Sequence, residues 1–422
     1  MTLEGRQPLR ALVIAQDFPW PTDTGSMLRL AAVIGALGTL GPVDLFATVL
    51  DVRDQPTDVP PSAPVARSAT SVYPWRRLSP LERARLMVAR DTLEVAFRRA
   101  PRLRADLDRF AQPPYDLVWV SKATTFVALG EPRLGPTVVD LDDLEDRKIR
   151  ARLDDPSFAL QYPPGPFGRV HAVLARAQAG LNAHHWSSLQ RRIAASVEAV
   201  VVCSDLDRGR LPVPNAVVVP NGYDPPAAPV GRTEVSEAPT VLLQGVLIYP
   251  PNADAARWLA EDIAPRLRQL RPQVEVRLVG TNLGLGGLHD PPRVTLTGWV
   301  PDIVPELARA DVVAVPVRFG SGTRVKILEA FAHRIPVVST TLGAEGLEAR
   351  HGEHLLLADT ADDFAAACAR LLDDRELRSR LVDNAHRLLV DRYTWAGAQA
   401  GIIELARRLT VTASAEPVAG RA

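Results

Sequence analysis

The sequence predicts an α/β protein built from two Rossmann-like domains, each with a parallel sheet covered by helices. Short β-branched runs alternate with longer amphipathic stretches in both halves of the chain, which is the pattern of stacked βαβ units. A length of 422 residues is more than one hydrophobic core usually serves, so two domains are expected. The turn-rich residues 220–226, followed by a polar stretch to Pro239, place the boundary between the halves.

The first half contains five short runs that we expect to form strands, with helices in the gaps. These runs are residues 12–16, 43–48, 116–121, 137–141 and 199–203. Residues 55–80 carry many prolines and predict a surface loop, and residues 163–166 predict a second break. In this prediction residues 1–222 form the N-terminal domain.

The second half repeats the same alternation. We expect strands over residues 240–245, 274–279, 294–297, 312–315 and 336–339, and helices from about residue 252 and over residues 324–333, 362–372 and 376–390. Residues 223–392 then form the C-terminal domain. Residues 393–422 are expected to supply a helix that packs back toward the N-terminal domain, and then a tail that frays after Val411.

Composition and charge exclude several classes of protein. Hydrophobic residues make up 46% and charged residues 23%, as in ordinary soluble globular proteins. Forty-nine basic residues balance 49 acidic ones, so the bulk charge favours neither nucleic acid nor an anionic membrane. No apolar run approaches the roughly 20 residues that a membrane helix needs, so membrane contact is expected to be peripheral at most.

The cysteine content points to a reducing compartment. Cys203 and Cys368 are too few for a disulfide framework and lack the spacing of a metal site. We therefore expect a cytoplasmic protein. Abundant arginine, alanine, leucine, valine and proline with few lysines indicate a GC-rich bacterial source.

Residues 320–329, GSGTRVKILE, follow a buried-looking strand and open a helix. Backbone N–H groups point outward at a helix N-terminus and bind anions there. Gly320 and Gly322 let a diphosphate approach the main chain closely, and Ser321 and Thr323 can donate hydroxyl hydrogen bonds. The segment therefore predicts a cradle for a nucleoside diphosphate.

The charged residues of the same segment extend this prediction. Arg324 and Lys326 add positive charge. Glu329 lies six residues after Thr323, where a carboxylate can accept hydrogen bonds from both hydroxyls of a ribose. The alternative is that the glycines only form a turn and that the two cations lie on a solvated face. Because Lys326 is two positions after Arg324, the two side chains point to different sides of the helix.

Longer motifs resemble a known family. The run GTRVKILEAFAHRIPVVST, with GAEGL at residues 343–347, resembles the donor-site signature of the GT-B glycosyltransferases of family 4. LQG at residues 243–245 with YPPNADA at 249–255 resembles the opening of the same C-terminal domain, and PNGYD at 220–224 resembles the hinge motif. Residues 19–29, PWPTDTGSMLR, are similar to the first strand-to-helix loop.

The resemblance implies a GT-B fold of two facing Rossmann-like domains, with the donor held mainly by the C-terminal domain and the acceptor by the N-terminal one. It implies transfer with retention at the anomeric carbon and without a metal or other cofactor, the nucleotide sugar being a co-substrate. By the same resemblance Glu329 binds the ribose, backbone from Gly322 to Val325 holds the diphosphate, and Gly298 to Val300 border the base. The implied donor-binding set is Gly25, Gly245, Asn252, Gly298, Trp299, Val300, Gly320, Ser321, Gly322, Thr323, Arg324, Val325 and Glu329.

Trp299 has two interpretations, a base-stacking side chain or a half-buried aromatic at a strand end. The chain also departs from the family pattern at several positions. Many family members carry a glutamate eight residues before the ribose-binding one, and here that position is Ser321. Val246 and Pro251 stand where many members carry an arginine and a lysine. A leaving diphosphate still needs charge compensation, so Arg324 and Lys326 are the expected catalytic cations.

An acidic cluster at residues 140–146 follows a strand of the first half. Its Asp-x-Asp pattern could hold a divalent cation, as in GT-A glycosyltransferases. We prefer a role in which Asp142 or Asp143 orients the acceptor hydroxyl or stabilises positive charge on the sugar. The alternative is a helix N-cap with first-turn acids. His184 and His185 are adjacent on a helix and cannot face one metal.

The sequence therefore predicts a retaining glycosyltransferase that moves a sugar from a UDP-, GDP- or dTDP-linked donor to an acceptor hydroxyl. The acceptor is a small molecule or a glycan, in polysaccharide, glycolipid or natural-product glycosylation. Two alternatives are an inactive homologue that serves as a nucleotide-binding scaffold and a sugar-nucleotide epimerase or hydrolase on the same fold.

Overall fold

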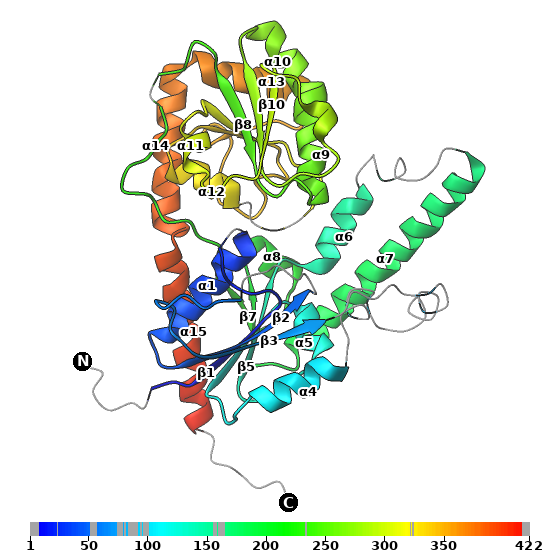
Figure 1. The fold of residues 1–422 in the computed structure, drawn as a ribbon, viewed down its shortest axis with the longest axis vertical. Coiled ribbons are helices and arrows are strands. Elements are labelled where there is room, and N and C mark those ends of the chain that lie inside the picture. Colours follow the sequence, from blue (N-terminus) through cyan, green and yellow to red (C-terminus); the bar gives the residue numbers. More distant parts are fainter. Residues whose placement is uncertain are drawn as a thin grey trace, which may run out of the picture. The chain divides into compact units, whose positions relative to one another are not determined.

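The structure is a computed structural model that describes residues 8–22, 24–50, 57–73, 79, 82, 92, 95, 101–154, 158, 165–232, 234–320, 322 and 325–415. It divides into two compact units (Figure 1). Unit 1 comprises Met1–Pro220 with Gly397–Ala422, and unit 2 comprises Asn221–Ala396.

Unit 1 contains a seven-stranded parallel sheet in the order β3-β2-β1-β4-β5-β6-β7. The strands are β1 (Ala11–Ala15), β2 (Val43–Leu50), β3 (Val65–Tyr73), β4 (Leu117–Ser121), β5 (Thr137–Asp142), β6 (Ala199–Val202) and β7 (Ala216–Val218). The strand order reverses between β1 and β4, and ligands of open α/β sheets bind beyond the carboxyl ends of strands at such a point.

The helices of unit 1 connect these strands. They are α1 (Gly25–Gly38), α4 (Pro101–Phe110), α5 (Ala123–Ala128), α6 (Glu145–Asp154), α7 (Pro166–Ala194) and α8 (Asp205–Arg210), and most of α15 (Trp395–Ala415) also belongs to this unit. Thr24 caps α1 by accepting a hydrogen bond from the Met27 N–H at 3.3 Å. The fully buried Trp119 and Trp186 belong to the core of this unit.

The surface loop predicted over residues 55–80 is wrong for residues 65–73, which form β3 beside β2. The six prolines that indicated a loop all lie outside β3 in the sequence, with Pro56, Pro60, Pro61 and Pro64 before it and Pro74 and Pro80 after it. Inside β3 exposed and partly buried side chains alternate over its first six positions. Polar serines, a threonine and an arginine fill this edge strand, so its apolar pattern is weak.

Unit 2 contains a six-stranded parallel sheet in the order β10-β9-β8-β11-β12-β13. Its strands are β8 (Thr240–Gln244), β9 (Glu275–Val279), β10 (Val294–Gly298), β11 (Val312–Val315), β12 (Val337–Ser339) and β13 (Leu356–Leu357). Its helices are α9 (Pro250–Trp258), a π-turn η2 (Leu259–Ile263), α10 (Ala264–Leu270), a 3-10 turn η3 (Gly286–Leu288), α11 (Val304–Leu307), α12 (Val325–Ala332), α13 (Ala361–Asp373) and α14 (Arg375–Arg392). The two-domain α/β prediction is confirmed, with all five strands predicted for this half present.

The PNGYD motif at the start of unit 2 forms hydrogen bonds with residues at the end of this unit. The Tyr223 N–H donates to the Tyr393 carbonyl at 2.8 Å, and Asp224 Oδ1 accepts from the Trp395 N–H at 2.9 Å. Asp224 therefore caps the N-terminus of α15 from a distant part of the chain. A Cβ on Gly222 would lie 2.6 Å from the Trp395 nitrogen, so only glycine allows this close approach.

Candidate functional site

Three glycines form a flat backbone edge at the carboxyl ends of β8, β9 and β10. Gly245, Gly280 and Gly298 have φ values of 139°, 134° and 83°, which other residues rarely adopt. A Cβ on Gly280 would lie 1.7 Å from the Gly245 carbonyl oxygen, and the Gly280 N–H donates to the Gly298 carbonyl at 2.8 Å. Glycine at position 280 thus allows close packing against the Gly245 backbone, whereas a Cβ on Gly298 would meet no atom within 4 Å, so the backbone there is open to a ligand. Gly280 was not among the predicted site residues.

The predicted phosphate cradle lies beyond β11, the next strand along the same edge. Gly320 and Gly322 have φ values of 109° and 88°, and α12 begins at Val325. Ser321, Thr323 and Arg324 lie outside the described residues, so the roles assigned to them stay predictions.

Lys326 brings a cation to the carboxyl end of β8. Its Nζ donates to Asn252 Oδ1 at 2.9 Å, and Asn252 Nδ2 donates to the Val246 carbonyl at 3.0 Å. A Cβ on Gly245 would lie only 3.2 Å from Lys326 Nζ. The positive charge that the sequence lacks at Val246 and Pro251 is thus supplied from α12.

Glu329, one turn further along α12, is held by two donors. Gln244 Nε2 donates to Glu329 Oε2 at 3.1 Å, and the Tyr223 hydroxyl also donates to this carboxylate. Burial raises the pKa of Glu329, and these hydrogen bonds and the charge of Lys326 offset only part of the rise. Burial and the Glu329 charge also raise the pKa of Tyr223, so its hydroxyl stays protonated and can donate.

Sequence reasoning missed Tyr223 and Gln244 as members of the site. Both lie in motifs noted in the sequence, Tyr223 in the hinge motif PNGYD and Gln244 in the run LQG. Their polar side chains at these positions could have indicated that they belong to the site. Gln244 is 3% exposed, and its Oε1 has no hydrogen-bond partner within the part of the chain that the structure describes.

Trp299 follows β10 at the end of the glycine edge. Its side chain is 61% exposed, so the prediction of a half-buried aromatic is wrong. Val300 packs against the core of unit 2 and anchors the segment. The exposed indole leaves its π-face available for stacking.

Asp142, the catalytic residue predicted in unit 1, lies in a buried charged network. Arg29 on α1 makes a bidentate pair with Asp140, at 2.8 Å and 3.0 Å, and also donates to the Val219 carbonyl at 3.0 Å. Asp142 pairs with Lys122 and accepts a hydrogen bond from Cys203 Sγ at 3.1 Å. Gly25, placed in the donor set, is the first residue of α1.

Asp142 is charged in this network. Burial by itself raises the pKa of Asp142, but the charges of Lys122 and Arg29 and the hydrogen bonds outweigh it and hold this pKa well below its usual range. The stability that this shift contributes is present above about pH 3.8 and is lost as the pH falls toward the lower folded pKa. Its role toward an acceptor stays a prediction.

The Asp-x-Asp carboxylates are engaged by protein cations, Asp140 by Arg29 and Asp142 by Lys122. Glu145 and Asp146 lie in the first turn of α6, as the helix-cap alternative predicted for first-turn acids. Among the described residues, no three or more His, Cys, Asp or Glu side chains are grouped as metal ligands.

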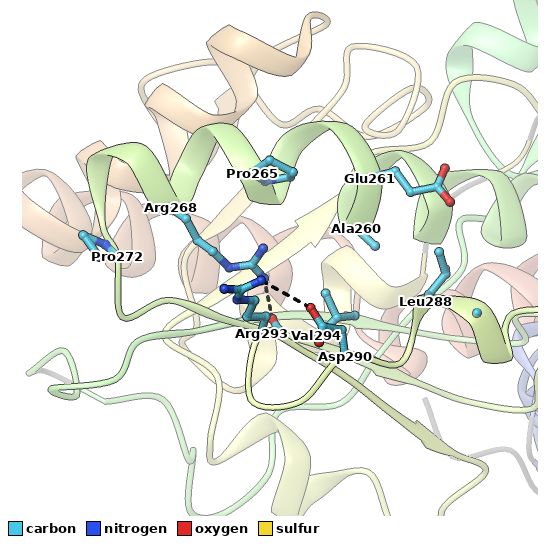
Figure 2. Close-up of a pocket in the computed structure, with 10 residues that line it drawn as sticks. Ala260, Glu261, Pro265, Arg268, Pro272, Leu288, Asp290, Arg293 and Val294 are labelled. Carbon is cyan, nitrogen blue, oxygen red and sulfur yellow. Dashed lines mark hydrogen bonds and ion pairs between the residues drawn. The ribbon is translucent and has the colours of Figure 1, made fainter.

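A cavity of about 640 Å³ lies elsewhere in unit 2, against η2, α10 and the start of β10 (Figure 2). Arg268 and Arg293 line it together with Glu261 and Asp290, so its charges balance. None of the predicted site residues lines this cavity, which lies toward the amino end of β10.

Comparison with known proteins identifies the second unit. Residues 238–374 match the family model described as Glycosyl transferases group 1. Part of unit 2 is therefore similar to the group 1 glycosyltransferases. This part contains the glycine edge, Lys326, Gln244 and Glu329.

Two curated relatives match this chain in part. It is 35% identical over 118 residues to the lipopolysaccharide core biosynthesis glycosyltransferase LpsE of Rhizobium meliloti, covering 28% of this chain and 33% of LpsE. It is 30% identical over 207 residues to the phosphatidyl-myo-inositol mannosyltransferase of Mycolicibacterium smegmatis, covering 45% of this chain and 51% of that protein. The matches therefore span about a third to a half of these relatives.

Solved structures match nearly the whole chain. The sucrose-phosphate synthase of Thermosynechococcus elongatus has a TM-score of 0.67 at 17% identity, covering 96% of this chain and 100% of that one. Anabaena HepE in complex with UDP and glucose has a TM-score of 0.60 at 17% identity, covering 95% and 100%. The predicted GT-B fold is confirmed.

The raised pKa of Glu329 predicts how the stability of unit 2 responds to pH. The folded chain binds this proton more tightly than the unfolded chain, so the contribution of Glu329 to stability falls as the pH rises above about 4.5. We expect Glu329→Gln to raise the thermal unfolding midpoint at pH 8 by about 2 °C. At pH 4 the difference should shrink, because the wild-type carboxyl is then protonated.

Scanning calorimetry at the two pH values measures this effect. The exposed Glu353 of unit 2 provides the control, since Glu353→Gln removes a carboxylate without burial. A lower midpoint of Glu329→Gln at pH 8 would show that the hydrogen bonds, and not burial, dominate at Glu329.

Proposed function

We propose that the chain is a retaining glycosyltransferase that moves a sugar from a nucleoside-diphosphate donor to an acceptor hydroxyl without a metal. The observation that carries the proposal is the placement of Lys326 and Glu329. Both lie on α12 beside the glycine edge, Lys326 against Gly245 and Glu329 against Gln244 at the end of β8. A cation and a ribose-binding carboxylate thus share one open backbone edge.

In the proposed reaction, the residues along this edge have different roles. The bond between the anomeric carbon and the diphosphate breaks, the acceptor oxygen forms the new bond to that carbon, and the acceptor hydroxyl proton passes to the departing diphosphate. Negative charge grows on the departing diphosphate, where the Lys326 ammonium and the N–H groups opening α12 stabilise it. Glu329 accepts hydrogen bonds from the ribose hydroxyls, and Trp299 stacks on the base.

Known proteins support the choice of donor and acceptor classes. The HepE structures hold UDP and, in another complex, UDP-glucose. The relatives are named for lipopolysaccharide core biosynthesis and for phosphatidyl-myo-inositol mannosylation. We therefore propose a UDP-, GDP- or dTDP-linked donor and a glycan, lipid-linked or small-molecule acceptor, in a bacterial cytoplasm.

Thermal-shift measurements with UDP-, GDP-, dTDP- and ADP-sugars test donor binding. Ligand at 100 times its dissociation constant stabilises a folded protein by about 2.7 kcal/mol, which gives a clear shift of the midpoint. We expect one nucleotide class to shift the wild type and to shift Glu329→Ala far less. If no nucleotide sugar shifts the midpoint, the donor site is misassigned.

Transfer is tested with the donor class so identified and a panel of acceptors, in excess EDTA. We expect nucleotide release that depends on acceptor, and NMR of the product should show the anomeric configuration of the donor. Binding without release for any acceptor or water would favour the scaffold alternative. A changed free sugar nucleotide would favour an epimerase.

A further inference from the structure

The first half of α7 exposes a continuous apolar surface. Phe167, Val170, Val173 and Leu174 are 84%, 56%, 67% and 59% exposed. At 100° per residue these positions span about 120° of the helix circumference, and we call them the apolar arc. Exposed apolar side chains are normal when scattered, but neighbours on one face mark a contact surface.

The opposite side of α7 is the side that packs within unit 1. Gly168, Asn182 and Trp186 are buried and lie about half a turn from the apolar arc. α6 packs along α7, and in Figure 1 the two helices extend away from the sheet of unit 1. One face of α7 is therefore buried within unit 1, and the apolar arc on the other face does not contribute to the core.

The charge of α7 indicates what covers the arc. The helix has 29 residues with four arginines and no aspartate or glutamate, in a chain whose formal charge is zero. Arg169 and Arg176 lie along one edge of the arc and His171 along the other. Two copies of this face would bring arginine against arginine, which disfavours self-association.

We propose that the apolar arc and its flanking arginines bind the surface of an anionic lipid bilayer. The apolar side chains enter the boundary between headgroups and acyl chains, and the long arginine side chains reach the lipid phosphates. No described helix has the length and apolar character to cross a bilayer, so α7 lies on the surface. This binding is separate from the proposed transfer and needs no donor.

Vesicle co-sedimentation of the full chain tests the proposal. We expect binding to phosphatidylcholine vesicles that contain 30% phosphatidylglycerol, weakening in 1 M salt, and at least about ten-fold weaker binding to pure phosphatidylcholine. The double variant Phe167→Asp/Val173→Asp should bind anionic vesicles at least about ten-fold more weakly. Leu283→Asp is the matched control, because Leu283 is 83% exposed in unit 2.

Circular dichroism melting confirms that each variant is folded. If Phe167→Asp/Val173→Asp does not fold, Arg169→Glu/Arg176→Glu replaces it, with the same expected loss. Absence of binding by the wild type, or equal binding by wild type and folded variant, overturns the proposal. Conversion of a dimer to a monomer by Phe167→Asp/Val173→Asp overturns it too and assigns the arc to a second copy. Because the readout is lipid binding, a failed transfer assay leaves it unaffected.

Discussion

Arg29→Met is expected to lower the free energy of unfolding of unit 1 by about 3 to 5 kcal/mol. Arg29 and Asp140 are 4% and 3% exposed and pair through two hydrogen bonds. Methionine fills the space of the arginine stem but leaves the Asp140 carboxylate buried without its cation. It also removes the donor to the Val219 carbonyl. Removal of one partner of a buried pair costs more than the pair itself contributes.

Arg104→Met is the matched control for this loss. Arg104 Nε contacts both oxygens of Asp108 at 2.8 Å and 3.0 Å, but this pair lies on the surface of α4. An exposed pair contributes about 0.2 to 1 kcal/mol, so the control should lose little. Urea unfolding gives the free energies, and hydrogen exchange of the β5 amides reports unit 1 separately. Equal losses in the two variants would contradict the assignment of the effect to burial.

Lys326→Met is expected to reduce kcat by about 10²- to 10³-fold while the donor dissociation constant changes much less. The ammonium lies over Gly245, where the usual cations are replaced by Val246 and Pro251. Its charge acts mainly on the departing diphosphate, because negative charge there grows in the transition state. Methionine preserves the aliphatic packing of the stem and removes the charge together with the hydrogen bond to Asn252.

Two measurements separate the charge of Lys326 from its packing. Lys326→Arg keeps the charge and should retain more of kcat than Lys326→Met does. Calorimetric titration with the donor reports binding independently of turnover. Unchanged kcat in Lys326→Met would show that another cation serves the diphosphate, and Arg324→Met would then identify whether it is Arg324. A tenfold loss in kcat corresponds to about 1.4 kcal/mol of transition-state stabilisation.

The strands and helices of unit 2 were predictable because they depend on apolar periodicity and turn residues within a few positions of the chain. The run Val312–Val315 is β-branched and apolar and forms β11 at the predicted residues. The helix predicted over residues 376–390 appears as α14, with Asp374 as its N-cap. Gly320 and Gly322 were recognised because glycines between a strand and a helix let a diphosphate approach the main chain, and both have positive φ in the structure. The edge strand β3 was not predicted because polar residues occupy much of its exposed face, so its apolar pattern is weak.

The sequence by itself determined the fold class, the cradle glycines and the carboxylate Glu329. Only the tertiary structure decided which side chains meet them. Gln244 and Glu329 are 85 positions apart in the chain, Asn252 and Lys326 are 74 apart, and Arg29 and Asp140 are 111 apart. The physical reason is that these contacts depend on strand order, which right-handed crossovers set over whole βαβ units, whereas periodicity and turn chemistry act over a few residues.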